Sequence, residues 1–236
     1  MLAHILTQSG VSIVIPGRAP ISVSSDHADY AAVLSVLKNS GTAEDIDEIL
    51  NRESKALEKA VSAIEAEFPD LKISHITGNV TYAGQNLGSR LAATILRQLA
   101  EGFDLRPIAR FIQKLAKNPS NRVWAQLYDF LEAGSIPITE EGNFRVYKAI
   151  RHDWLDIHSA SMDNSVGQVV TMSRNHVDDD PEVTCSHGLH VCSYAYLAFF
   201  ARAEGKGRVV ECDVSPEDVV AIPKDYNNTK MRVCRY

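Results

Sequence analysis

The sequence lacks any apolar run that approaches the roughly 20 residues needed to cross a bilayer, so we expect no transmembrane helix. The opening stretch, Met1 to Leu6, is too short for a secretory signal peptide and lacks its basic start. Cysteine is scarce, with four in 236 residues, and without an export signal these are expected to be free thiols rather than disulfides. Together these absences predict a soluble protein of the cytosol.

An excess of basic residues is also absent. The chain has 24 Lys and Arg against 30 Asp and Glu, which gives a formal net charge of −6. A surface that follows phosphates usually needs the opposite balance, so we expect no DNA binding, although a local basic patch stays compatible with these totals. No internal repeat or low-complexity tract is visible. A chain of this length can bury a good core, as one large domain or two small ones.

The N-terminal third mixes strand and helix patterns. Val11–Ile15 and Ile21–Ser24 alternate apolar and small polar residues around a five-residue turn, which predicts a hairpin. Thr42, with Asp45 three residues later, predicts a capped helix start. Two further helices and a strand region are expected over Asp29–Lys38, Glu53–Glu67 and Lys72–Ala83, the last with a turn at Gly78.

The remaining chain separates into a helical part and a strand-rich part. Leu87, Leu91, Ile95 and Leu99 repeat at four-residue spacing and predict the first of three helices, which end at Gly134. Beyond Ser135 the expected strands are Phe144–Ile150, Val169–Met172, Leu189–Cys192, Arg208–Val214 and Val219–Pro223, and the one main helix is Tyr194–Ala203, capped by Ser193. We therefore predict an α+β fold with domains at residues 1–84, 85–135 and 136–236.

The stretch Cys185–Ser193 holds two of the four cysteines and two of the eight histidines. Thiolate and imidazole suit zinc, and a metal site would use Cys185, His187, His190 and Cys192. The spacing is not that of a standard zinc finger, and alternate residues of a strand point to opposite faces. We therefore favour buried side chains without a metal, and we predict no cofactor.

Catalysis by a cysteine and a histidine is a second interpretation of these residues. Cys185 or Cys192 would be activated by His158, His176 or His190, but such a pair must meet in space, which the sequence does not show. No protease or transferase signature surrounds either cysteine. We therefore leave the enzyme question open and favour a protein that is not an enzyme.

A phosphate- or nucleotide-binding pocket is the third interpretation. Lys and Arg supply charge, and Ser, His and backbone N–H groups supply directed hydrogen bonds, where a compact β domain brings strand ends together. Aspartates near His158, including Asp156, are expected to form turns. The predicted ligand-binding residues are Tyr147, Lys148, His158, Ser159, His190, Lys230 and Arg232.

The order of these elements is loosely similar to ADP-ribosyltransferase folds. Those enzymes need a late glutamate on a strand, and residues 224–236 contain none. If the fold is shared, we expect the transferase activity to be lost.

A series of motifs follows one another in the C-terminal half: Phe144–Ile150, His158–Ser159, Asp163–Asn164, Cys185–Ser193, Asp218–Pro223, Asp225–Asn227 and Lys230–Arg232. This series resembles the rIIB-type lysis-inhibition family of T-even bacteriophages and its relatives in other tailed phages, most clearly over residues 85–236. The resemblance implies a phage protein in the cytoplasm of the infected bacterium, peripheral to the membrane and working with an rIIA-type partner. It also implies a role in lysis timing and in resisting host exclusion systems.

Three functions remain open from the sequence. The favoured one is a phage accessory protein that acts without catalysis, by binding a partner protein, a host defence component or a nucleotide-like signal molecule. The alternatives are a nucleotide-acting enzyme that uses His158, His190 and a basic residue, and a scaffold for the rIIA-type partner. In each case we expect a homo-oligomer.

Overall fold

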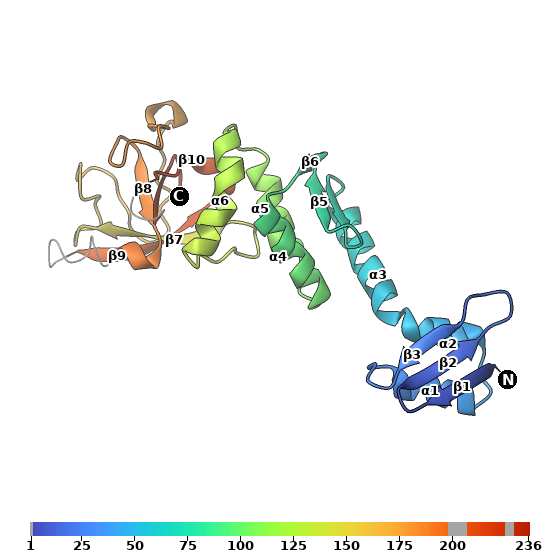
Figure 1. Cartoon of the computed structure of the whole chain (residues 1–236). Coiled ribbons are helices and arrows are strands. Elements are labelled where there is room, and N and C mark those ends of the chain that lie inside the picture. Colours follow the sequence, from blue (N-terminus) through green and yellow to red (C-terminus); the bar gives the residue numbers. More distant parts are fainter. Residues whose placement is uncertain (1, 198–206, 225–228) are drawn as a thin grey trace. The chain divides into compact units, whose positions relative to one another are not determined.

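The computed structural model describes residues 2–197, 207–224 and 229–236 (Figure 1). Its helices and three sheets confirm the predicted α+β fold. The chain forms two compact units, Met1–Ala63 and Ile64–Tyr236. The predicted domain boundaries near residues 84 and 135 stay predictions. Over the described ranges, no helix combines the length and the apolar character needed to cross a membrane.

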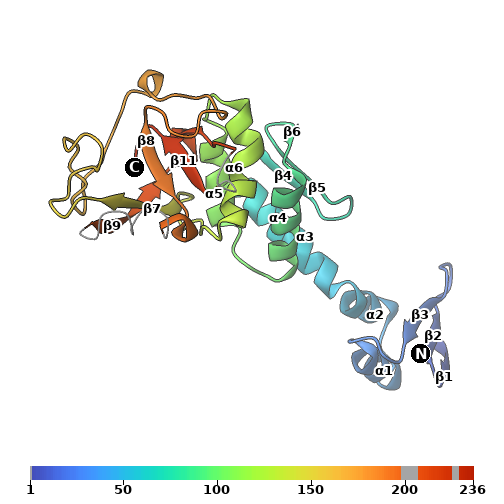
Figure 2. The same ribbon diagram turned by 60° about the vertical axis from the view of Figure 1, so that its left-hand side comes forward.

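The first unit contains an antiparallel sheet in the order β1 (Ala3–Thr7), β2 (Gly10–Val14), β3 (Ile21–Ser24). The predicted hairpin is confirmed as β2 and β3, whereas β1 was not predicted. Helices α1 (Tyr30–Lys38) and α2 (Ala43–Leu50) lie on one face of this sheet (Figures 1 and 2). A core forms between the two layers from Val11, Ile13, Ile15, Val23, Val33, Leu37 and Ile46.

The predicted start of α2 is confirmed in atomic detail. The Asp45 backbone N–H donates to Thr42 Oγ1 at 3.2 Å, and the Thr42 backbone N–H donates to Asp45 Oδ2 at 2.7 Å. This reciprocal pair satisfies two backbone donors that the first turn of a helix leaves without partners. The sequence pattern was sufficient here because every contact lies within four residues.

Helix α3 (Arg52–Glu67) leads into a small antiparallel sheet of β4 (Leu71–Ser74), β5 (Asn79–Tyr82) and β6 (Gln85–Asn86). The predicted turn at Gly78 joins the first two strands, and its backbone has a φ of 71°, which glycine adopts without strain. Both the helix and the strand alternation over Lys72–Ala83 are therefore confirmed.

The three predicted helices of the middle region are confirmed as α4 (Ser89–Ala100), α5 (Arg106–Leu115) and α6 (Asn121–Ala133). They lie between the small sheet and the strands of the C-terminal half (Figure 2). Their apolar stripes are buried, with residues such as Leu91, Ile95, Phe111, Ile112, Leu127 and Leu131 at the core. Burial of these stripes supplies most of the stability of such short helices.

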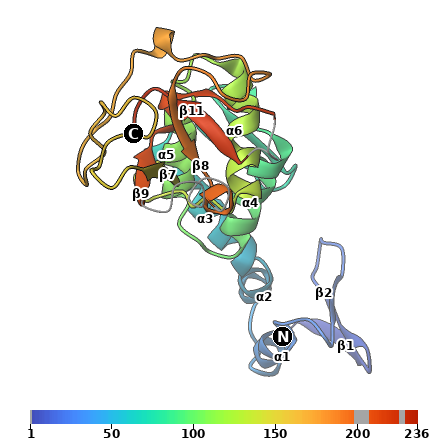
Figure 3. The same ribbon diagram turned by 90° about the vertical axis from the view of Figure 1, so that its left-hand side faces the viewer.

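The C-terminal half is built on a five-stranded sheet, which we call the C-terminal sheet. Its strands are β7 (Phe144–Ile150), β8 (Leu189–Cys192), β9 (Arg208–Val214), β10 (Val219–Ala221) and β11 (Lys230–Val233). Their order is β10-β11-β8-β7-β9, and every neighbouring pair is antiparallel. Figure 3 labels β11, β8, β7 and β9 of this sheet. β8, the predicted strand Leu189–Cys192, lies in the middle of the sheet.

Of the elements predicted for this half, one strand is wrong and one helix lies largely outside the described residues. The predicted strand Val169–Met172 is wrong as a strand, because only one isolated bridge forms there, between Thr171 and Arg235. The predicted helix Tyr194–Ala203 begins with a 3-10 turn at Tyr194–Tyr196, and residues 198–206 lie outside the described residues. Two other 3-10 turns occur at Arg174–His176 and Pro216–Asp218.

Asn118, in the α5–α6 connection, ties the helices to the C-terminal sheet. Its Nδ2 donates to the backbone oxygens of Pro216 and Val219, each at 2.8 Å. Its Oδ1 accepts from the Ser120 backbone N–H at 2.9 Å and from Arg174 Nη2 at 3.1 Å. The Asn118 side chain therefore connects the start of α6 to the 3-10 turn Pro216–Asp218 and to the first residue of β10.

Candidate ligand cavity at strands β7 and β8

A cavity of about 480 Å³ opens beside β7 and β8, and we call it the β7–β8 cavity. Its walls also include residues 156–159 and 185–188. Much of the surface is apolar, from Met162, Met172, Leu189, Val191 and Tyr196. A largely apolar cavity with a few convergent polar groups is the usual form of a small-molecule site, and the volume falls within the roughly 300–1,000 Å³ typical of such sites.

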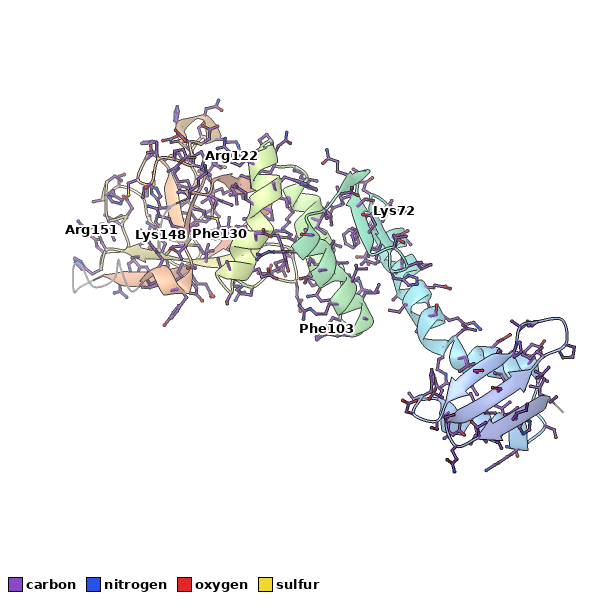
Figure 4. All side chains as sticks on the ribbon, viewed as in Figure 1. Lys72, Phe103, Arg122, Phe130, Lys148 and Arg151 are labelled. Carbon is purple, nitrogen blue, oxygen red and sulfur yellow. The ribbon has the colours of Figure 1, made fainter. Side chains whose placement is uncertain are left out.

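Six of the seven predicted ligand-binding residues line this cavity: Tyr147, Lys148, His158, Ser159, His190 and Lys230. They come from β7, from the loop after β7, from β8 and from β11. Lys148 lies among the side chains of the C-terminal sheet, where Figure 4 labels it. The seventh residue, Arg232, is not part of the lining. Binding of a ligand by these residues stays a prediction.

The cavity begins where β7 and β8 separate. In the described residues these strands share a single register pair, Tyr147 with Cys192. Beyond that pair the backbone oxygen of His190 accepts from Lys148 Nζ, at 3.0 Å, instead of from the neighbouring strand. The lysine side chain thus replaces a ladder hydrogen bond, and the gap between the strands leaves space for a ligand.

The Lys148 ammonium group is held in a poorly solvated place. Burial lowers the pKa of Lys148, and the nearby Cys212, Asp156 and Cys192 offset this effect only in part. The ring of Tyr236 lies 5.4 Å from Nζ, within the range of a cation–π contact. Within the described ranges, no carboxylate comes within 4 Å of Lys148 Nζ.

His190 presents a neutral ring to the same cavity. Burial lowers the pKa of His190 to about 4, with smaller contributions from Lys148, Lys230, Arg232 and His158. The Nε2 atom is buried and has no hydrogen-bond partner among the residues that the structure describes. A buried polar atom without a partner costs free energy, which a bound ligand would recover by supplying one.

Asp156 organises the loop that forms one wall. Its carboxylate accepts from the Ser159 N–H at 2.6 Å, the Ser159 hydroxyl at 2.7 Å, the Met162 N–H at 2.9 Å and the Ser161 N–H at 3.0 Å. Burial alone would raise the pKa of Asp156, but these hydrogen bonds outweigh it and hold the pKa well below its usual range. The predicted turn-forming role of Asp156 is confirmed, and the Ser159 hydroxyl is used within the loop.

Arg232 is fully buried and supports the wall formed by residues 178–188. Its guanidinium donates to the backbone oxygens of Asp178 at 2.7 Å, Val183 at 2.6 Å and Asp180 at 2.5 Å. Gly188 lies against it with a φ of 149°, and a Cβ there would stand 2.8 Å from Val177 Cγ1 and 3.3 Å from Arg232 Cδ. In this structure Arg232 therefore acts as a structural support for the cavity.

The two cysteines near the cavity differ in exposure and in their contacts. Burial raises the pKa of Cys192 to about 12, and its Sγ donates to the Tyr147 backbone oxygen at 3.3 Å. Cys185 is exposed, with Lys230 Nζ at 3.5 Å from its Sγ. Where the chain is described, no hydrogen bond joins a histidine ring to a cysteine or serine side chain; the His187 ring contacts the His176 backbone oxygen at 2.6 Å. The same residues contain no group of three His, Cys, Asp or Glu side chains arranged to hold a metal ion.

Several wall residues were not predicted from the sequence: Met162, Met172 and Tyr196 in the lining, and Tyr236 behind Lys148. The Tyr236 hydroxyl donates to Asn164 Oδ1 at 2.5 Å, and burial raises the pKa of this tyrosine. Tyr196 belongs to the aromatic run after Ser193, and this run could have suggested a place in the cavity wall. No sequence pattern marks the two methionines or Tyr236, because a single apolar or aromatic residue fits any part of a core.

The comparisons with known proteins agree with the motifs described above. The family model "Bacteriophage T4 protein rIIB" matches residues 3–236. Protein rIIB of Enterobacteria phage T4 is 37% identical over 226 residues, which is 96% of this chain and 69% of that protein. No solved structure matches the chain. The family that the C-terminal motifs predicted is thus confirmed by a match over nearly the whole length, and the chain belongs to the bacteriophage T4 rIIB family.

Proposed function

We propose that this rIIB-family protein is a phage accessory protein that modulates lysis timing or counters a host exclusion system by binding, without catalysis, in the cytoplasm of the infected bacterium. The bound molecule is a small nucleotide-like signal held in the β7–β8 cavity. The observation that carries the proposal is the convergence of Lys148 and His190 from two separated strands on one largely apolar cavity.

The chemistry of the cavity supports binding over catalysis. An enzyme would need an activated nucleophile or a paired acid and base within hydrogen-bond reach. The Cys192 thiol has a raised pKa and donates to a backbone oxygen, and the Asp156 carboxylate is occupied by four donors. These groups hold the walls in place, which suits a binding site.

Native mass spectrometry of the protein purified from infected cells tests the proposal. We expect a mass above that of the chain and a small molecule released on denaturation. The Lys148→Met variant should lose this added mass, because its side chain keeps the length but not the charge. The matched control is Lys117→Met, which removes the same charge from an exposed position outside the cavity lining. Wild-type protein without any bound small molecule would refute binding in this cavity.

A scaffold for an rIIA-type protein is the second candidate, and it rests on strand β1. In the part of the chain that the structure describes, β1 pairs with β2 alone, so its other edge is open. The sequence of β1 contains no lysine or proline to block edge-to-edge pairing, and Ile5 and Leu6 are 63% and 56% exposed. An open, apolar edge of this kind favours pairing with another chain.

The scaffold candidate predicts that the double substitution Ile5→Lys and Leu6→Lys abolishes co-purification with the rIIA-type protein. If a second copy of this chain covers the edge instead, the same variant should turn a homo-oligomer into a monomer by light scattering. The control is Ile76→Lys, since Ile76 is 84% exposed and lies outside β1. An unchanged complex and an unchanged mass would remove β1 as an interface.

A further inference from the structure

The ionisable groups that line the β7–β8 cavity carry a small net charge. Lys148 and Lys230 contribute two positive charges, and Asp156 contributes one negative charge. The lining histidines are counted as neutral, as in the formal charge of the chain. The sum is therefore one positive charge in a largely apolar enclosure.

Among the described residues, the Asp156 carboxylate makes no ion pair with Lys148. The Asp156 carboxylate is occupied by Ser159, Ser161 and Met162. Lys148 uses one of its three N–H donors on the His190 backbone oxygen, which leaves donors for a ligand. A buried ammonium group is costly unless an anion compensates it.

A hydrogen-bonding position lies beside this charge. Over the described part of the chain, the buried His190 Nε2 has no hydrogen-bond partner, and the backbone oxygen of the same residue accepts from Lys148 Nζ. The surrounding wall offers Met162, Met172 and the Tyr196 ring, which suit a flat, unsaturated ring system. The cavity therefore suits a ligand with an anionic group for Lys148, one polar atom for His190 Nε2 and a flat ring for the apolar wall.

Resting on the proposed function, we propose that the β7–β8 cavity selects a ring compound whose acidic group carries a single negative charge, as in a nucleoside phosphodiester or an aromatic carboxylate, and discriminates against polyphosphates. A single charge neutralises the lining. Lys148 has donors left for the first charge, whereas Lys230 Nζ already lies 3.5 Å from Cys185 Sγ and 6.0 Å from the centre of the Tyr196 ring. Each further charge would therefore compete with these contacts in an apolar space, and 1.4 kcal/mol of such a cost is a factor of ten in affinity.

Isothermal titration calorimetry of the full chain tests this selectivity at pH 7.5. The probes are 3′,5′-cyclic AMP with one charge, AMP with two charges and ATP with four charges, together with indole-3-carboxylate. We expect cyclic AMP to bind at least about tenfold more tightly than AMP, and ATP to bind more weakly still. If only indole-3-carboxylate binds, the ligand is still a ring compound with a single negative charge, and its acidic group is a carboxylate.

Two variants connect this ranking to the cavity charge. Lys148→Met should abolish binding of cyclic AMP, whereas Lys117→Met should leave it unchanged. Met172→Lys adds one positive charge to the lining and should narrow or reverse the preference for cyclic AMP over AMP. An unchanged ranking in Met172→Lys would overturn the charge argument.

The failure of this inference can be distinguished from failure of the proposed function. If ATP binds more tightly than cyclic AMP, and Lys148→Met removes that binding, the selectivity is wrong while ligand binding stands. If no probe binds, the molecule released in native mass spectrometry decides: a ring compound with one acidic charge supports the inference and a polyphosphate overturns it. Protein that is free of any small molecule in that experiment refutes both.

Discussion

At the scale of single residues, Arg232 is a fully buried cation whose guanidinium donates to three backbone oxygens. Its guanidinium holds Asp178, Asp180 and Val183 in place, so Arg232→Leu would remove the donor of the Asp178 and Val183 oxygens, whereas the Asp180 oxygen keeps the Val183 N–H. Each unsatisfied buried group costs about 1–3 kcal/mol, so we expect a loss of about 2 kcal/mol or more in the free energy of unfolding. Chemical denaturation measures this loss. The control Arg235→Leu, at an exposed position three residues later, should change stability little.

His190 makes the stability depend on pH in a defined direction. Its pKa falls from 6.5 to about 4 in the folded state, so the unfolded chain binds more protons between these values. The free energy of unfolding should therefore decrease as the pH falls from 6.5 to 4, by about 3 kcal/mol at most, and this contribution should be constant above and below that window.

The variant His190→Leu isolates this contribution. It removes both the titrating ring and the unpartnered Nε2, so we expect equal or higher stability at pH 7 and a flatter profile between pH 6.5 and 4. The same variant should lose any ligand that uses Nε2. Denaturation midpoints at several pH values provide the measurement, and an unchanged slope in the variant would show that other groups cause the pH dependence.

Residue chemistry alone predicted which side chains gather at the cavity but not how each is used. Lys230 and Arg232 are alternate residues of β11 and pair with Cys192 and His190 of β8. Strand geometry places both on one face, and both were predicted to bind ligand. Their roles differ because the fold of residues 178–183 brings three backbone carbonyl groups to the Arg232 guanidinium. Such loop contacts span about 50 residues of sequence and leave no local pattern.

At the scale of elements, the connection between α5 and α6 is stabilised by one amide. Asn118→Ala would remove the donors to Pro216 and Val219 and the acceptor for Arg174. The Pro216 oxygen keeps the Val219 N–H and the Val219 oxygen keeps Arg174 Nη2, so the cost is that of the lost hydrogen bonds. At about 1 kcal/mol for each bond, we expect a loss of about 2 kcal/mol or more in stability. Hydrogen exchange should rise in the first turn of α6 and in β10. The control is Asn121→Ala, at an exposed position in that first turn, and an equal effect of both substitutions would contradict the special role of Asn118.

Elements governed by local contacts were predicted well, and those governed by distant contacts were not. The Thr42 capping box and the apolar repeat of α4 lie within single helices, and both are confirmed. Strand β1 was missed because Ala3–Thr7 shows no regular alternation and is recognised only by its pairing with β2. Val169–Met172 has β-branched residues but meets only the last residues of the chain, so no ladder develops.

At the scale of the whole molecule, the two compact units have separate cores and separate candidate surfaces. The first unit has its own apolar cluster and the exposed strand β1. The second contains every lining residue of the β7–β8 cavity. A ligand that binds in this cavity should therefore stabilise the second unit and leave the unfolding of the first unchanged.

A fragment of residues 52–236, which keeps α3 whole, tests this division. We expect it to fold on its own, because Ile64, Phe68 and the cores of α4–α6 and the C-terminal sheet lie within it. Calorimetry should show two transitions in the full chain and retain one of them in the fragment, at a nearly unchanged midpoint. Native mass spectrometry of the fragment should show the same bound molecule as the full chain. A fragment that folds but binds nothing would mean that residues 1–51 contribute to the ligand site, and a single transition in the full chain would mean that the units unfold together.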